Sequence, residues 1–242
     1  MPALLMRLAG PMQAWGTQSR FTVRDTGMEP SKSGVIGLIC SALGRPRTKS
    51  IEDLCSLKMG VRVDQEGVMK REYQTAGGGK MWGKDYGVIN ADEKSRKTVT
   101  SSRYYLCDAD FIVGFQGDDP ELLSEIQLHL KNPVWQIFLG RKAFVPSVPV
   151  FFPDEIAIVE ENDLEKALSS IPWPRQGKPV PEEKKRPERI RFVIEKSYGE
   201  SPETRFDQPE PFSFSNRRFL PRNVETRFPV LGKDITLREE AT

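Results

Sequence analysis

Pro30-Ser-Lys-Ser-Gly-Val-Ile-Gly-Leu-Ile-Cys-Ser-Ala-Leu-Gly44 predicts a single buried helix, and the rest of the chain can be arranged around it. Ser31 is a favoured N-cap residue, and the apolar side chains of residues 35–43 recur at helical spacing. Gly44 fits the left-handed position just beyond a helix end, and Pro46 prevents the helix from continuing. We therefore expect a helix with an apolar face and a polar N-terminus.

The N-terminus of this helix is a candidate anion site. Free backbone N–H groups, the positive end of the helix dipole and the Lys32 and Ser33 side chains meet there, which suits a phosphate. Ordinary capping is the competing interpretation, because most helices that begin with Ser and Lys bind nothing. A nucleoside-triphosphate loop is excluded, since Thr26 and Ser31 replace both glycines of the G-x-x-x-x-G-K-[ST] motif.

Composition and charge are typical of a globular protein with a heavily charged surface. The chain has 242 residues, of which 38% are hydrophobic and 29% charged. No apolar run approaches the roughly 18 residues of a membrane span, and no signal peptide is evident, so we expect a cytoplasmic protein without a membrane partner. Three widely spaced cysteines and one histidine argue against a disulfide framework and a zinc site. The net charge is only +2, but residues 1–50 are locally basic.

The order of predicted elements favours an α+β protein of the split βαβ, ferredoxin-like class. Helices would lie on one face of an antiparallel sheet, as in RRM-like domains, although this fold does not decide function. Met59–Val63 and Val68–Tyr73 would form a hairpin. Further strands are expected at 3–9, 103–115, 148–152, 190–195 and 224–230, and further helices at 119–132 and 162–171.

Three segments carry candidate nucleic-acid contacts. A long loop over residues 12–24 displays Gln13, Trp15, Arg20 and Arg24 and lies in the basic part of the chain. Residues 77–101 alternate glycines with cations and aromatics, which predicts a mobile projecting arm that suits single-stranded nucleic acid, although a solvated loop is the alternative. The third segment is a glycine turn, Phe138–Pro146, that carries two adjacent cations in a positive local field.

Four motifs occur in the order found in the CasD subunits of type I-E CRISPR Cascade complexes, which belong to the RAMP superfamily. They are Arg7-Leu-Ala-Gly-Pro-Met-Gln-Ala-Trp-Gly16, Pro30-Ser-Lys-Ser-Gly-Val-Ile-Gly-Leu38, Tyr105-Leu-Cys-Asp-Ala-Asp110 and Phe138-Leu-Gly-Arg-Lys142. The chain resembles this family from its N-terminus to about residue 152. The resemblance implies a ferredoxin-like palm of residues 1–76 and 102–230 and a thumb hairpin of residues 77–101. Residues 172–189 would be an extended linker or loop, and residues 231–242 a C-terminal tail.

The resemblance further implies a non-catalytic subunit, without a cofactor or metal, that caps the 5′ handle of the guide RNA. It would contact the Cascade backbone subunits through its thumb and also touch the large subunit that reads the PAM, so that it meets target DNA only indirectly. The residues expected to contact the RNA are Gln13, Trp15, Arg20, Arg24, Lys32, Ser33, Lys80, Trp82, Lys84, Tyr86, Arg103, Gly140, Arg141 and Lys142.

Two other hypotheses stay open. A metal-independent endoribonuclease that processes precursor guide RNA would need an acid and a base, and Tyr104, Tyr105 and Lys142 are available for those roles. The single histidine, His129, lies at the edge of an apolar helix face and is poorly placed for catalysis. Alternatively, the protein is a scaffold whose arm binds only other subunits.

Overall fold

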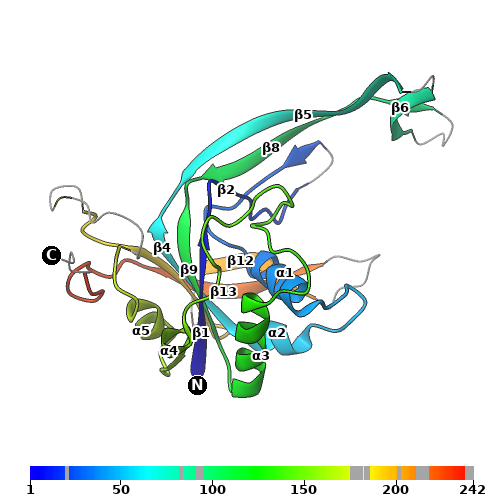
Figure 1. The fold of residues 1–242 in the computed structure, drawn as a ribbon. Coiled ribbons are helices and arrows are strands. Elements are labelled where there is room, and N and C mark those ends of the chain that lie inside the picture. Colours follow the sequence, from blue (N-terminus) through cyan, green and yellow to red (C-terminus); the bar gives the residue numbers. More distant parts are fainter. Residues whose placement is uncertain are drawn as a thin grey trace.

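The chain folds around two largely antiparallel sheets (Figure 1). The computed structural model describes residues 1–19, 22–81, 84–90, 95–174, 182, 186–200, 203–210 and 218–237. The larger sheet has seven strands in the order β10-β1-β9-β4-β11-β13-β12. Their bounds are β1 Pro2–Ala9, β4 Lys58–Gln65, β9 Asp110–Gln116, β10 Ile158–Glu160, β11 Arg191–Lys196, β12 Glu203–Pro209 and β13 Phe219–Arg227.

Helices cover both faces of the larger sheet. Alternate residues of a strand point to opposite faces, and in β1 the side chains of Leu4, Met6 and Leu8 join a core with α1 (Lys32–Leu43), α2 (Glu52–Ser56) and α3 (Pro120–Lys131). Ala3 and Leu5 instead join a second core beneath α4 (Asp154–Ala157) and α5 (Leu164–Ser169). The expectation of helices on one face only is therefore wrong, because β1 and β9 are apolar on both sides.

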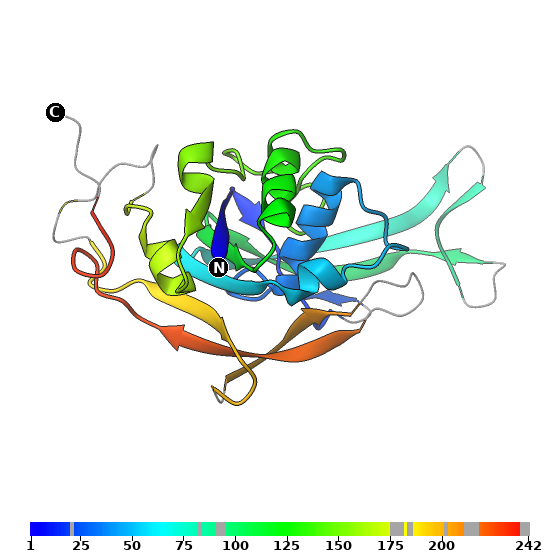
Figure 2. The ribbon, with the colours of Figure 1, turned by 90° about the horizontal axis from the view of Figure 1, so that it is seen from below.

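The smaller sheet forms an arm that projects from the body (Figures 1 and 2). β5 (Val68–Met81) pairs with β8 (Val99–Cys107) from Val68↔Cys107 to Ala76↔Val99. The short strands β6 (Lys84–Ile89) and β7 (Arg96–Lys97) extend the sheet beyond this ribbon, and β2 (Met12–Gln13) and β3 (Val23–Arg24) pair with β8. The ribbon therefore begins well before the predicted segment 77–101.

Two sharp corners separate the arm from the body. β4 pairs with β9 and β11, whereas β5 pairs with β8 and β6, so the predicted hairpin of residues 59–73 is wrong. The chain turns out of the larger sheet at Gly67, where φ is +74°, and returns to it at Asp108, where φ is +56°. The predicted strand 103–115 is thus two strands in different sheets. Arg7 Nη2 contacts Asp110 Oδ2 at 2.8 Å and ties β1 to β9 beside this junction.

Local capping explains the helices that the sequence predicted correctly. α1 ends at Gly44, which has φ +65°, and α3 begins after Asp119, whose Oδ1 accepts a 3.0 Å hydrogen bond from Leu122 N. The helix expected at 162–171 is confirmed as α5. The expected strand 148–152 is wrong, because its described backbone makes only an isolated bridge between Met6 and Phe151. None of the described helices is long and apolar enough to cross a membrane.

Candidate nucleic-acid interface

A carboxylate from the far end of the chain occupies the N-terminus of α1. Asp207 on β12 accepts a 2.8 Å hydrogen bond from Lys32 N, and Arg222 on β13 holds the same carboxylate through two contacts of 2.6 and 3.0 Å. Ser31 is the N-cap residue, but its side chain makes no capping hydrogen bond. The anion that the helix dipole favours is therefore one of the protein's own carboxylates.

The Lys32 side chain is also buried and bonded to internal partners. Its Nζ lies 3.0 Å from Glu195 Oε1 and 3.1 Å from Cys55 O, and the residue is only 1% exposed. Burial lowers the pKa of Lys32, while the negative charge of Glu195 opposes that shift. This corrects the expectation of an external phosphate at this lysine, because no ligand can reach its ammonium group in this conformation.

Gln13 also has a structural role. Its side chain is fully buried, and Nε2 donates to Leu8 O at 3.1 Å and to Ala109 O at 2.8 Å. Its Oε1 accepts a 3.0 Å hydrogen bond from Trp15 Nε1. Because all these partners are internal, Gln13 positions the Trp15 ring, and the expected RNA contact at Gln13 is corrected to this positioning role.

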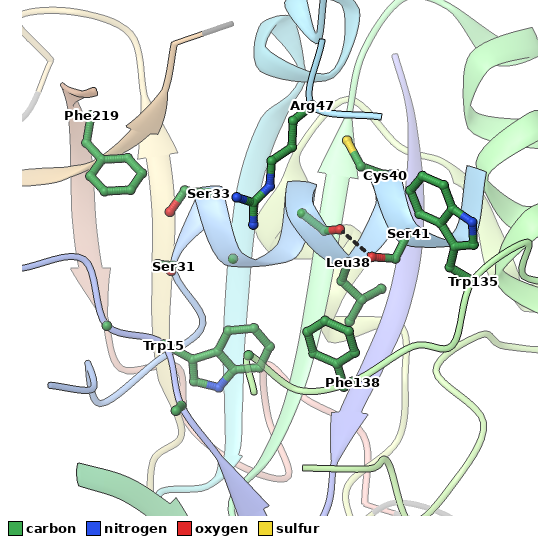
Figure 3. A pocket seen from close by; sticks show the side chains of 15 residues that line it. Trp15, Ser31, Ser33, Leu38, Cys40, Ser41, Arg47, Trp135, Phe138 and Phe219 are labelled. Atoms are coloured by element: carbon green, nitrogen blue, oxygen red, sulfur yellow. Dashed lines mark hydrogen bonds between the residues drawn. The ribbon is translucent and has the colours of Figure 1, made fainter. Parts of the chain in front are cut away.

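A surface pocket of about 320 Å³ runs along one side of α1 (Figure 3). Aromatic side chains from three separate segments line it, namely Trp15, Trp135 with Phe138, and Phe219. The remaining lining residues are, apart from Leu38, small, polar or cationic: Ala14, Gly16, Ser31, Ser33, Gly34, Gly37, Leu38, Cys40, Ser41, Arg47 and Gly140. The structure thus brings three of the expected residues, Trp15, Ser33 and Gly140, to one cavity.

The glycine turn is held close to the loop that precedes α1. Gly140 has φ +91°, and a Cβ atom there would lie 1.8 Å from Ala14 O, so only glycine fits. Ala14 N donates to Leu139 O at 3.1 Å, and Phe144 N donates to Arg141 O at 2.8 Å to close the turn. This packing presents Arg141 and the exposed Lys142 beside the pocket.

Arg141 lies at the centre of a cationic group at the base of the arm. Its Nη2 donates to Tyr104 O at 2.7 Å, and its guanidinium carbon stands 5.3 Å from the centre of the Phe144 ring. Glu72 Oε1 is 3.8 Å from Nη1. Burial lowers the pKa of Arg141, with nearby Arg103 and Arg24 acting in the same direction and Glu72 opposing them. Arg24 and Arg103 are paired neighbours on β3 and β8, so three arginines meet at this corner with two carboxylates, Glu72 and Asp25.

The tip of the arm carries a second cluster of expected residues. Lys80 and Tyr86 line a pocket of about 370 Å³, and Gly78, Gly79, Arg96, Lys97 and Thr98 complete it. Tyr86 is 51% exposed, so its ring is available to a partner. Arg20, Trp82 and the side chain of Lys84 lie outside the described residues.

The residues considered for catalysis are dispersed. Tyr104 contributes its backbone oxygen to Arg141, and the Tyr105 ring packs against Phe144 with 5.8 Å between ring centres. His129 is half-buried on α3 rather than on the glycine turn that carries Lys142. In the described part of the chain, no three His, Cys, Asp or Glu residues are grouped as ligands for a metal ion.

Four other pocket residues were not predicted as site residues from the sequence. Arg47, the neighbouring Trp135 and Phe138, and Phe219 come from three separate segments, and only the folded chain brings them together. The spacing of Gly34 and Gly37 was an available clue, because residues three apart share one side of a helix. A Cβ at Gly34 would approach Trp15 Cε3 to 2.9 Å, so this glycine allows the tryptophan to pack against α1.

Comparisons with known proteins agree with one another. Residues 3–225 match the family model described as CRISPR-associated protein (Cas_Cas5). The CRISPR system Cascade subunit CasD of Escherichia coli (strain K12) is 34% identical over 176 residues, which cover 68% of this chain and 75% of that protein.

Two solved structures are similar over almost the whole chain. One, described as the crystal structure of a Cas protein, is 37% identical with a TM-score of 0.71, covering 98% of both chains. The other, from a CRISPR RNA-guided surveillance complex, is 33% identical with a TM-score of 0.75, covering 95% of this chain and 90% of that one. On these matches, the chain belongs to the CRISPR-associated Cas5 family and is similar to its CasD members.

Proposed function

We propose that this protein is a non-catalytic, cytoplasmic subunit of a CRISPR surveillance complex that holds the 5′ handle of the guide RNA. The observation that carries the proposal is the glycine turn, which sets Arg141 and Lys142 between an aromatic-lined pocket and the arginines at the base of the arm. Cations suit the RNA backbone, and aromatic rings suit unstacked bases. The similarity to an Escherichia coli Cascade subunit supports the same conclusion.

The proposed architecture is a ferredoxin-like palm with a thumb. Strands β1, β4, β9 and β10 stand in the order β10-β1-β9-β4 and are connected through α1 and α3, as expected for a split βαβ unit. The arm would be the thumb, and its basic tip around Lys80 and Tyr86 suits either RNA or a neighbouring subunit. Through these surfaces the protein would join the backbone subunits to the PAM-reading large subunit and meet target DNA only indirectly.

The role proposed for each residue in RNA binding depends on how exposed its side chain is. Arg24 and Lys142 are exposed and would bind phosphates directly. Arg141 is partly buried, with Nη2 donating to Tyr104 O and Arg24 O and Nη1 buried, so it would act mainly through its positive charge. Ser33 would add a hydrogen bond from the pocket wall. Arg103, Lys80 and Tyr86 would extend the contact along the arm, and Arg20, Trp82 and Lys84 remain candidates from the sequence alone.

Salt-dependent RNA binding tests this proposal. Arg24→Gln and Lys142→Gln should each weaken binding of the repeat-derived RNA and reduce the slope of log K against log salt by about 0.7 per lost contact. Lys166→Gln is the matched control, because Lys166 is exposed on α5 on the opposite face of the larger sheet. Unchanged slopes for both variants would refute the assignment.

Two further measurements separate the competing functions. Incubation of the protein with repeat RNA in EDTA should leave the RNA intact, and a discrete product would favour the endoribonuclease. Ultraviolet crosslinking of the assembled complex should give RNA adducts at the glycine turn. If adducts are confined to other subunits, the protein is a scaffold.

A further inference from the structure

We infer that the pocket beside α1 receives one unstacked nucleobase of the RNA strand that passes over the glycine turn. The inference rests on the proposed RNA-binding function and assigns a specific task to one cavity within it. Gly140 lines the pocket and is followed directly by Arg141 and Lys142, so a strand whose phosphates lie on those cations runs past the pocket mouth.

The walls of the pocket suit a flat aromatic ring. Trp15 is 2% exposed and held by the hydrogen bond of its Nε1 to Gln13, so its ring forms the fixed, buried back of the pocket. The rings that a base can reach are those of Trp135, which is 48% exposed, and of the half-buried Phe138 and Phe219. Phe138 and Phe219 approach from other segments, as Figure 3 shows. Aromatic side chains bind unpaired bases by stacking, and a wall that is already ordered lowers the entropic cost of binding.

The floor of the pocket is open because of one glycine. A Cβ added at Gly37 would meet no atom within 4 Å, although the residue lies in the middle of α1. Glycine in the interior of a helix is unfavourable by about 1 kcal/mol relative to alanine. No contact of the described residues requires glycine here, and the space beside Gly37 is open.

Polar groups at the rim favour a base over an apolar protein side chain. Arg47 is exposed and, as Figure 3 shows, directs its guanidinium over the middle of α1. The hydroxyl groups of Ser33 and Ser41 lie along the same side, and Ser41 Oγ donates to Gly37 O at 3.1 Å. None of the described residues that line the pocket is acidic. Because Ser41 Oγ already donates to Gly37 O, it can only accept a further hydrogen bond, while Arg47 supplies donors and positive charge. These groups match the edge of a base on a phosphate backbone.

A substitution that fills the pocket with a larger side chain tests the inference. Gly37→Leu should project its side chain into the open space without a backbone clash, and Gly37→Ala is the matched control because its methyl group leaves most of the space free. The full-length protein would be titrated with repeat-derived handle RNA and with copies in which one nucleotide at a time is abasic. Thermal unfolding of both variants checks that the fold is retained.

One abasic position should weaken binding to the natural protein by about tenfold to a hundredfold, the range expected for the loss of one stacked base. Gly37→Leu should bind intact RNA equally weakly and show no further loss at that position, whereas Gly37→Ala should behave like the natural protein. If the two losses multiply, or if Gly37→Leu binds intact RNA normally, no base enters the pocket.

The outcomes also separate this inference from the proposed function. Salt-slope losses in Arg24→Gln and Lys142→Gln without coupling at Gly37 would refute the pocket assignment and leave the RNA-binding function standing. If Gly37→Leu binds RNA normally but no longer assembles with its protein neighbours, the pocket binds a protein side chain and not a base. Absence of any RNA binding by the natural protein would refute both proposals.

Discussion

Replacing Asp207 with alanine should destabilise the fold at the buried N-terminus of α1. The substitution removes the carboxylate that accepts from Lys32 N and leaves Arg222 without its two contacts of 2.6 and 3.0 Å. The Arg222 side chain is only 5% exposed, so water cannot easily replace the lost partner. Two elements are affected together, the start of α1 and the β12–β13 pair.

The size of the effect follows from these contacts. Loss of a helix-capping acceptor costs about 1 kcal/mol, and removal of one partner from a buried ion pair costs about 3–5 kcal/mol. Arg222 keeps a weaker contact with Glu195, 3.5 Å from its Nη1, which places the ion-pair loss at the low end of that range. We expect about 4 kcal/mol in total, equivalent to a fall in Tm of about 8–16 °C for a chain of this size.

Thermal and urea unfolding of the full-length protein would measure this loss. The double variant Asp207→Ala/Arg222→Met should recover much of it, because removing both charges leaves no unpaired buried ion. Asp53→Ala is a matched control in the more exposed Arg45 pair and should cost no more than about 1 kcal/mol. A fall in Tm of less than about 2 °C for Asp207→Ala would refute the structural role of this carboxylate, and no recovery in the double variant would refute the cost assigned to the unpaired Arg222.

The remaining predictions concern the pocket and the turn. Burial raises the pKa of the Cys40 thiol from 9.0 to about 11, so its stabilising contribution is complete below pH 9 and is lost as pH rises through about 11. The free energy of unfolding, measured with urea, should therefore fall more between pH 9 and 11 for the natural protein than for Cys40→Ala; equal slopes would contradict this. Gly140→Ala forces a Cβ against Ala14 O and should cost about 1–3 kcal/mol of stability together with RNA affinity. Thermal unfolding and RNA titration would measure both losses, and a variant unchanged in either would show that the turn tolerates a side chain.

Sequence patterns predicted the elements that are encoded locally. The C-cap residue of α1 is Gly44, and the N-cap residue of α3 is Asp119. Both adjoin their helix in the sequence, and the structure confirms both caps. β1 was recognised because seven of its eight residues are apolar, the exception being Arg7, and all eight are buried. In these cases the chemistry of neighbouring residues is sufficient to define the element.

Features that depend on distant partners could not be obtained in this way. Hydrophobic alternation identified β4 and β5 as strands but not the strands with which they pair. The turn at Gly67, which connects two different sheets, was therefore predicted to be a hairpin turn. Lys32 seemed available to a ligand because its actual partner, Glu195, is 163 residues away. Asp207, which occupies the helix N-terminus, lies 175 residues from Lys32. The charges at the start of α1 are therefore balanced by residues from the other end of the chain, which no local window reveals.

The arm joins the larger sheet through two short turns, at Gly67 and Asp108. A Cβ at Gly67 would lie 2.8 Å from the Ala109 Cβ and 2.9 Å from Cys107 O, so the outgoing and returning strands bend against each other. The ribbon from Val68 to Ala76 is about 27 Å long, and a rotation of about 10° at its root would move the far end by about 5 Å. The backbone geometry of these two residues, together with the pairing of β8 with β2 and β3, therefore determines where the cations near the tip lie.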